Sequence, residues 1–487
     1  MALLLLAILV FFLMSPYALL LSQFSLPFSM NGEDFFWAFK NTLLEALGSS
    51  VLSVILGCGG GLGLLWLRRK LTTKTYSVLE ILFLLPTVLP SLFVVVSCLG
   101  FFQPFPYGKM GVILIQTVIN VGLVSVLFSR LCLSKLSALG DLSLIEGAGR
   151  AQFLRVGVLS YLGPDIFYLF LYLFSMSMAS FNVPLLVGGT SGTTIEVLIY
   201  ENLVIAHNWS QAISLSLFQM VILGSLGLWI RPSNFGFEFK ESHALLELAE
   251  WKWGLIFPAL ACFVILVPPI FSLPSGLLQL HFIKVQWGDL IRPALMSLLL
   301  GLLTGLILFL FLCGASIVFL FKGWRQFAMA YTPPSGILMG FSFFILARWI
   351  DVGVFTQIVL GLTLMFFVSV YRLSLATPLA SLRGQIETAS VLGANPFETF
   401  RSIVLPQIWQ PLTFATAIGA MWACGDFALS SILSSEDFHL ALMVKSLAGG
   451  YRLDAAQALM WLLYFVIMIS FVFWWRLGDV FNRKFGR

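Results

Sequence analysis

The residues best arranged for a specific task lie between positions 374 and 409, a segment that separates two apolar runs. Apolar and small residues recur there at intervals of three or four, at Leu379, Leu382, Ile386, Ala389 and Gly393. This spacing predicts a helix with one continuous face, ending at Gly393 as its C-cap. Small residues let a second backbone approach closely, and Glu387 stands at the edge of the face. The chemistry that this pattern favours is the docking of a partner protein.

A turn and a second short helix are predicted to follow. Residues 394–396 break the first helix, and Pro396 is favoured in the first turn of the next one. Phe400 and Ile403 continue an apolar side until the Leu-Pro pair at 405–406 ends this helix. We therefore expect a helix–turn–helix on the cytoplasmic surface.

The residue types used in catalysis are scattered elsewhere in the chain. The four histidines stand singly, and the six cysteines include no CxxC pair, which is typical of small buried side chains. No phosphate-binding loop occurs, because the Gly-Lys step at 108–109 is followed by Met110. We expect no catalytic residue, no metal site and no cofactor, and we expect that the chain is not an enzyme.

Acidic residues near apolar runs have two interpretations. Asp426 lies near the outer end of one run, shortly after Trp422, where its charge would attract a cation on a translocation path. The alternative is an interfacial residue that is solvated or paired locally. Glu80 and Asp165 stand at the expected cytoplasmic ends of helices, where an acid is ordinary.

The elements that position these residues are membrane helices. Hydrophobic residues make up 59% of the 487 residues and charged residues 10%, against about 25% in soluble proteins. So few charges cannot cover a soluble protein of this size, which excludes a soluble enzyme and a disordered chain. The net charge of +5 is small and scattered, which excludes a nucleic-acid binder.

Runs of about 20 apolar residues predict twelve transmembrane helices. Their approximate extents are 2–22, 43–67, 77–101, 110–130, 165–187, 209–230, 253–273, 293–321, 334–349, 354–373, 410–430 and 456–475. With the N-terminus in the cytoplasm, twenty of the 27 lysines and arginines fall inside and seven outside. This asymmetry predicts that both termini are cytoplasmic.

Glycine and proline mark special points within these spans. Glycines cluster in 57–63 and form a GxxxG pair at Gly301 and Gly305, which predicts close helix packing or, alternatively, a flexing gate. Pro86 and Pro90 predict a kink or a broken start of a span.

The chain also contains an internal duplication. Residues 145–164 and 386–406 both begin Ile-Glu-x-Ala, and their glutamates, Glu146 and Glu387, are 241 positions apart. Each half then holds six spans, so the halves are parallel repeats about an axis along the membrane normal. The expected divisions are a first repeat, a polar cytoplasmic linker and a second repeat, at 1–230, 231–252 and 253–487.

The second loop, 374–409, resembles a known docking motif. Its matching residues are Glu387, Thr388, Ala389, Gly393, Ala394, Phe400, Ile403, Leu405 and Pro406. Their order resembles the EAA loop of ABC-importer permeases, whose short helices sit in a cleft of the ATPase subunit. The resemblance implies that these residues couple the chain to an ATPase.

The loop of the first repeat, 134–164, resembles the motif less closely. Three of its residues match: Glu146, Gly147 and Ala148. Ala151 or Gln152 stands where this alignment expects glycine. The resemblance implies that this loop docks as well.

Two permease domains fused head to tail are similar to the thiamine and ferric-iron importer permeases. Residues 193–200, and Gly-Asp at 425–426 with 450–456, resemble the thiamine permeases more. The resemblance implies the type I ABC-importer permease fold, with thiamine or a phosphate ester of it as substrate and ferric iron as the alternative. It also implies two copies of an ATPase subunit, a periplasmic substrate-binding protein and the inner membrane of a bacterium.

Two other classes of protein fit less well. An ion-coupled secondary transporter can have six plus six spans, but it needs ion-binding acids near the midplane of several helices, and only Asp426 comes close. A membrane-embedded enzyme needs paired acids, a histidine cluster or a zincin-type motif. Recovery of an ATPase with the chain would separate the permease from both.

Overall fold

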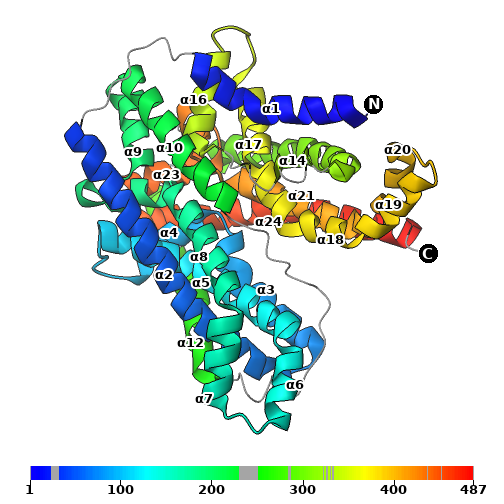
Figure 1. Ribbon diagram of the computed structural model, residues 1–487. Coiled ribbons are helices and arrows are strands. Elements are labelled where there is room, and N and C mark those ends of the chain that lie inside the picture. The colour runs from blue at the N-terminus through cyan, green and yellow to red at the C-terminus, as the bar shows by residue number, and fades with distance from the viewer. Residues whose placement is uncertain are drawn as a thin grey trace. The chain divides into compact units, whose positions relative to one another are not determined.

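The computed structural model describes most of the chain, in residues 2–22, 32–229, 251–282, 287–321, 323–324, 327–328, 331, 334–435, 437–450 and 452–485. Helices are the only regular secondary structure of these residues (Figure 1). The predicted all-α fold class is confirmed.

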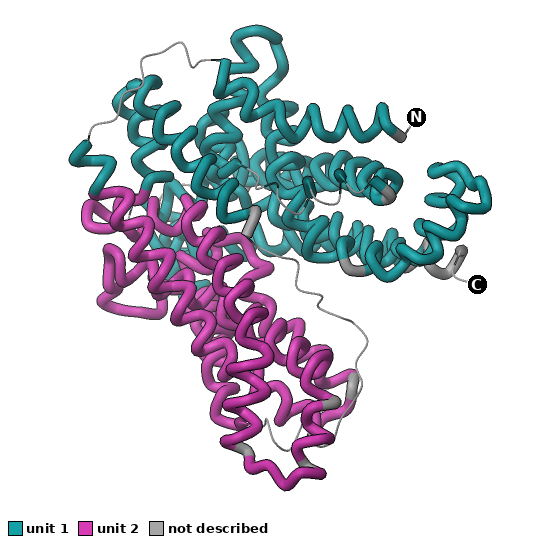
Figure 2. Tube along the Cα trace, viewed as in Figure 1, with its two compact units in different colours: residues 1–36, 195–228, 272–487 teal, residues 37–194, 229–271 magenta. Residues whose placement is uncertain are grey.

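Unit 1 is the larger of two compact units and comprises residues 1–36, 195–228 and 272–487 (Figure 2). An extended apolar cluster in it joins Leu13, Leu312, Phe367 and Leu412. Its helices are α1 (Ala2–Ser22), α9 (Ile195–Tyr200), η4 (Glu201–Ile205), α10 (Trp209–Trp229), α13 (Leu273–Phe282), α14 (Trp287–Ile317), η6 (Val318–Leu320), α16 (Gly336–Leu346), α17 (Val354–Val370), η7 (Tyr371–Leu375), α18 (Ala376–Ser381), α19 (Arg383–Val391), α20 (Pro396–Thr399), η8 (Phe400–Val404), α21 (Leu405–Gly425), α22 (Ser430–Leu433), α23 (Leu440–Gly449) and α24 (Leu453–Phe485).

Unit 2 comprises residues 37–194 and 229–271. Two ion pairs lie in it: Arg130 Nη2 is 3.1 Å from Glu80 Oε2, and Lys135 Nζ is 2.7 Å from Asp165 Oδ1. Its helices are α2 (Gly32–Lys70), α3 (Thr73–Val88), α4 (Ser91–Phe101), α5 (Lys109–Lys135), α6 (Ser137–Ile145), α7 (Arg150–Phe153), η1 (Leu154–Tyr161), α8 (Gly163–Met178), η2 (Pro184–Gly188), η3 (Thr190–Gly192), η5 (Lys252–Leu255) and α12 (Ile256–Phe271).

The two units do not follow the two halves of the sequence. Within unit 1, α1 from the first half packs on α14 and α16, and Tyr331 Oη donates to the carbonyl of Leu13 at 2.8 Å. Within unit 2, α12 from the second half packs on α3, α4 and α5, and Cys262 Sγ donates to the carbonyl of Leu82 at 3.2 Å. Each half therefore places its first helix in the unit that the other half mainly builds.

Among the described residues, eight helices are long and apolar enough to cross a membrane: α1, α2, α5, α10, α12, α14, α17 and α24. Two bent pairs raise the number to ten, α3 with α4 at 93° and η1 with α8 at 57°. The prediction of a polytopic membrane protein is confirmed at this level.

The other two predicted spans do not pass the same test. The run at 334–349 forms α16, whose 11 residues fall short of the roughly 20 that a membrane requires. The run at 410–430 lies in α21, which is 21 residues long but places Gln407, Gln410 and Thr413 among its apolar residues. Twelve spans are therefore not confirmed.

Helix starts recur along the chain at a nearly constant interval. The first residues of α4 and α16, of α5 and α17, and of α9 and α23 are each 245 positions apart. Those of α6 and α19, and of η1 and η8, are one position further apart. The interval that relates these helices is therefore longer than the 241 positions between Glu146 and Glu387.

The glycine and proline signals correspond to local features of the fold. A Cβ atom at Gly301 would overlap Cys424 Sγ, and one at Gly57 would overlap the side chain of Val124. Close helix packing at these glycines is therefore confirmed. Pro90 stands at the break between α3 and α4, where the sequence predicts a kink.

Candidate protein-docking site

The predicted helix–turn–helix is present at one end of unit 1 (Figure 1). Two helices, α18 and α19, form its first part, with a break at Leu382. Leu379, Leu382 and Ile386 are buried in the core of unit 1, as their spacing predicts. This burial fixes the direction in which α19 projects its other side.

The turn after α19 is built around Gly393. Its φ of +82° lies in the left-handed region, which a residue without a Cβ atom adopts at no steric cost. Gly393 N donates to the carbonyl of Ser390 at 3.1 Å, and Ala394 N donates to that of Ala389 at 3.0 Å. These two bonds make a Schellman motif, so the predicted C-cap glycine is confirmed.

A capping box starts α20. Asn395 Oδ1 accepts a hydrogen bond from Phe397 N at 3.2 Å, and Glu398 Oε2 accepts one from Asn395 N at 3.3 Å. Pro396 occupies the first turn, as predicted. The short second helix therefore has a fixed starting direction.

The predicted end of this helix at residues 405–406 is wrong. The chain continues through the π-helical segment η8 into α21, and Pro406 lies in the first turn of α21. A proline is tolerated there because the first N–H groups of a helix have no intrahelical partner. Leu405 and Pro406 thus connect the docking helices directly to a long helix of unit 1.

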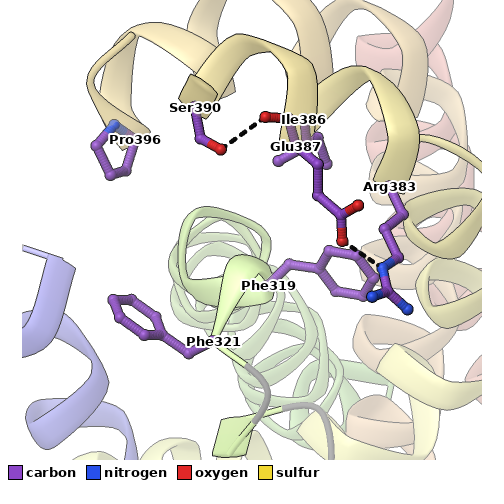
Figure 3. A pocket seen from close by; sticks show the side chains of 7 residues that line it. All are labelled: Phe319, Phe321, Arg383, Ile386, Glu387, Ser390 and Pro396. Atoms are coloured by element: carbon purple, nitrogen blue, oxygen red, sulfur yellow. Dashed lines mark hydrogen bonds and ion pairs between the residues drawn. The ribbon is translucent and has the colours of Figure 1, made fainter. Parts of the chain in front are cut away.

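A cavity of about 400 Å³ lies between α19 and the segment that follows α14 (Figure 3). Its lining residues are Phe319, Phe321, Arg383, Ile386, Glu387, Ser390 and Pro396. Arg383 Nε donates to Glu387 Oε1 at 2.5 Å, and both side chains are more than half exposed. An ion pair this exposed contributes about 0–1 kcal/mol to the stability of the chain.

A second hollow of about 610 Å³ lies on the other side of α19. Its lining residues are Gly384, Gln385, Thr388, Ala389, Leu392, Ser402, Ile403 and Gln407. Gln407 Nε2 donates to Gln385 Oε1 at 2.8 Å and ties the start of α21 to α19.

The surface that the turn offers to a partner differs from the prediction. Ala389 is only 7% exposed, so it cannot form a small-residue surface with Gly393. The exposed residues are instead Val391 at 86%, Leu392 at 82% and Phe397 at 45%. We call these three residues the apolar tip. The sequence did not predict them, because Val391 and Leu392 lie just outside the three-to-four spacing of the buried face.

The loop of unit 2 contains the same turn, but its glycine is Gly147 and not the residue that the sequence alignment of the two loops matched with Gly393. Gly147 has φ of +69°, and Ala148 N donates to the carbonyl of Ser143 at 2.8 Å. Gln152, which the alignment placed near the glycine position, lies in helix α7. The alignment is therefore wrong by five residues, because it matched the letters Glu-x-Ala and not the turn. Ile145 is 82% exposed in this loop.

Asp426 has a local partner, in agreement with the second of its two interpretations. Its carboxylate accepts a hydrogen bond from Leu429 N at 3.2 Å. Asp426 is 7% exposed and stabilises the start of α22. Trp422 packs on Phe366, with ring centroids 5.5 Å apart.

Two buried acids were not predicted from the sequence. Glu45 in α2 is 1% exposed and Glu196 in α9 is fully buried. Glu196 Oε1 accepts a hydrogen bond from Gln219 Nε2 at 2.6 Å. Polar residues at four-residue intervals before and after Glu45 are the sequence signal from which its burial could have been predicted.

Comparison with known proteins adds no assignment: no family model, no curated protein and no solved structure matches this chain.

Proposed function

We propose that this chain is the transmembrane permease subunit of an ATP-binding-cassette importer. The observation that supports this most directly is the apolar tip, which a glycine-defined turn holds away from the core of unit 1. Exposed apolar side chains on a fixed turn are suited to the cleft of a partner protein. The partner in this proposal is an ATPase that hydrolyses ATP in trans, so the chain itself is not an enzyme.

The proposed architecture is two parallel six-helix repeats of the type I permease fold. The nearly constant interval between helix starts in the two halves supports the duplication. In this proposal α16 and α21 complete the twelve spans, and each unit contributes one docking loop. One chain would then bind two ATPase copies.

The proposed location and solute follow from the proposal that the chain is an importer permease. The chain lies in the inner membrane of a bacterium with both termini in the cytoplasm and receives its solute from a periplasmic binding protein. The linker that this orientation places in the cytoplasm lies outside the described residues as far as Glu250. The proposed solute is thiamine or a phosphate ester of it, and ferric iron is the second choice.

Purification of the tagged chain from its native membrane tests this function. We expect an ATPase to be recovered at two copies for each copy of this chain, as measured by the mass of the purified complex. Two copies of this chain in a complex, or a transport-competent preparation without an ATPase, would contradict the proposal.

An ion-coupled secondary transporter is the second candidate, because Glu45 is a buried acid within a candidate span. Measuring solute uptake in membrane vesicles of both orientations distinguishes the importer from the secondary transporter. Uptake that persists with an ionophore and requires ATP fits the importer, whereas uptake that follows an ion gradient without ATP fits the secondary transporter.

A further inference from the structure

A polar face of α2 lies in the interior of unit 2. Asn41, Glu45, Ser49 and Ser53 stand four residues apart and are each at most 1% exposed. Residues at this spacing line one side of a helix. Polar residues inside a membrane span are costly to bury, so they mark functional positions by default.

The carboxylate of Glu45 lies on this face. Neither of its oxygens has a hydrogen-bond partner among the described residues. The backbone of η3 lies beside it, because a Cβ atom at Gly192 would be 3.0 Å from Glu45 Oε1. The charge of Lys109 acts on Glu45 from a distance, but its ammonium lies 4.7 Å from the ring centroid of Trp37 and forms no ion pair with Glu45.

Two buried amides of unit 2 also have atoms without a partner among the described residues. Asn41 Nδ2 donates to the carbonyl of Thr193 at 3.1 Å, and Asn41 Oδ1 accepts from no described residue. Gln116 of α5 is 3% exposed, and neither atom of its amide has a partner in the described part of the chain. α5 packs along α2 here, with Gly48 against Ile113 one turn before Gln116. Polar atoms without a partner among the described residues thus remain on both α2 and α5.

Protonation of Glu45 would not satisfy this group. It would remove the charge, but the carboxyl oxygens would still accept no hydrogen bond from the described residues. A cation that bears N–H or polarised C–H groups would neutralise the carboxylate and donate to the open Oδ1 atom of Asn41. A metal ion fits less well, since the described residues contain no group of three or more His, Cys, Asp or Glu that could hold one.

We propose that Glu45 and Asn41, one turn apart on the same face of α2, form a binding site in unit 2 for the positively charged group of an organic cation, with Glu45 as its counter-charge. The inference rests on the proposed function, in which that cation is the imported solute. Helix α14 of unit 1 offers no equivalent, because its one acid, Asp289, is exposed.

Labelling with a hydrophobic carbodiimide tests the site on the purified full chain. The reagent attacks carboxyl groups in apolar surroundings, and peptide mass spectrometry locates the adduct. We expect labelling of Glu45, its loss in Glu45→Gln, and protection by excess thiamine, used as the probe cation. Glu33→Gln is the matched control, because it removes the same charge from an exposed position of the same helix. Equal labelling of Glu45 with and without thiamine, or no labelling at all, would overturn the site.

Thiamine uptake by proteoliposomes that contain the purified complex gives a second measurement. Glu45→Gln keeps the shape of the side chain and removes its charge, so we expect uptake at low thiamine concentration to fall at least about tenfold, with ATPase binding unchanged. Unchanged uptake in this variant would also overturn the site.

The failure of the site and the failure of the proposed function give different results. If an ATPase co-purifies but thiamine does not protect Glu45, the importer assignment stands and the cation site is wrong. If thiamine protects Glu45 but no ATPase is recovered, the cation site stands and the importer assignment is wrong.

Discussion

The docking loop of unit 1, residues 376–404, and the loop of unit 2, residues 137–161, have the same backbone turn but different side-chain support. Gly393 and Gly147 both adopt positive φ, and both are followed by an alanine whose N–H closes the helix end. In unit 1 the next helix starts at Asn395 with a capping box, whereas the residue 246 positions earlier is Gly149, which has no side chain to cap with. The turn is therefore the constant feature of the two loops.

The two loops also share an exposed apolar residue beside the turn. Val391 is 86% exposed and Ile145, 246 positions earlier, is 82% exposed. The charged residues differ, since Arg383 and Glu387 form an ion pair in unit 1 and the matching positions hold Ser137 and Asp141. The two loops therefore share the turn geometry and one exposed apolar residue, but they do not share their charges.

The largest expected effect follows from replacing the turn glycine. Gly393→Arg forces a side chain into positive φ, which costs about 1–2 kcal/mol, and places it where a partner would approach. We expect loss of ATPase co-purification and of uptake with normal membrane insertion. Gly147→Arg should act in the same direction, because Gly147 and not Gln152 occupies the turn.

Gln152→Ala is the matched control for this pair, and it should leave both measurements unchanged. Full ATPase binding and full uptake in Gly393→Arg would remove the main support for the docking site. A severe effect of Gln152→Ala with a mild one of Gly147→Arg would restore the register that the sequence suggested.

A smaller effect is expected from a charge on the exposed apolar residues. Val391→Asp and Ile145→Asp change surface positions, so the stability of the chain should change by no more than about 0.5 kcal/mol. Loss of a central apolar contact weakens an interface by about 2 kcal/mol or more, which is over tenfold in affinity. Titration of purified ATPase onto each variant measures this. Equal losses would show that both loops dock, and an effect of Val391→Asp alone would restrict docking to unit 1.

The free energy of unfolding should depend on pH through a histidine of unit 1 that has no titratable counterpart in unit 2. Burial lowers the pKa of His439 in unit 1 to about 3 from its usual value near 6.5. The residue 245 positions earlier, Thr194, does not titrate. Below pH 6.5 the unfolded chain binds a proton that folded His439 rejects, so the free energy of unfolding falls as pH drops from about 6.5 toward 3, by at most about 1.4 kcal/mol per unit.

Thermal unfolding of the detergent-solubilised chain between pH 7 and pH 5 measures this dependence. His439→Gln should flatten it, since glutamine does not titrate in this range. An identical pH profile for the variant and the parent chain would show that His439 does not contribute.

The smallest effect is expected for the exposed acids. Glu387→Ala removes one exposed carboxylate. A single exposed ion pair with a partner would be worth about 0–1 kcal/mol, so ATPase affinity should fall by fivefold or less. Asp141→Ala should resemble it if the interval between helix starts also relates the two loops. The same titration of ATPase serves as the readout, and a loss as large as that of Gly393→Arg would make Glu387 a central contact.

Part of the docking site could be predicted from the sequence because it depends on local rules. The spacing of Leu379, Leu382 and Ile386 predicts a buried helical face, and the structure buries all three. Gly393 was identified as the helix end because few other residues adopt positive φ. Local rules fail where two local signals compete. Glu-x-Ala and Gly147 favour different alignments of the two loops, and a proline such as Pro406 is equally typical of the end and of the first turn of a helix.

The sequence by itself determined that the chain is helical and lies in a membrane, because its composition leaves too few charges for a water-exposed surface. It also determined where the docking turn of unit 1 bends, since backbone conformation there depends on one glycine. Only the tertiary structure decided that α1 and α12 pack in opposite units, that Ala389 is covered while Val391 is exposed, and that Glu45 is enclosed with no partner among the described residues. Those outcomes depend on which helices, distant in the sequence, pack together. Apolar periodicity predicts which side of a helix is buried, but it does not predict which other helix packs against that side.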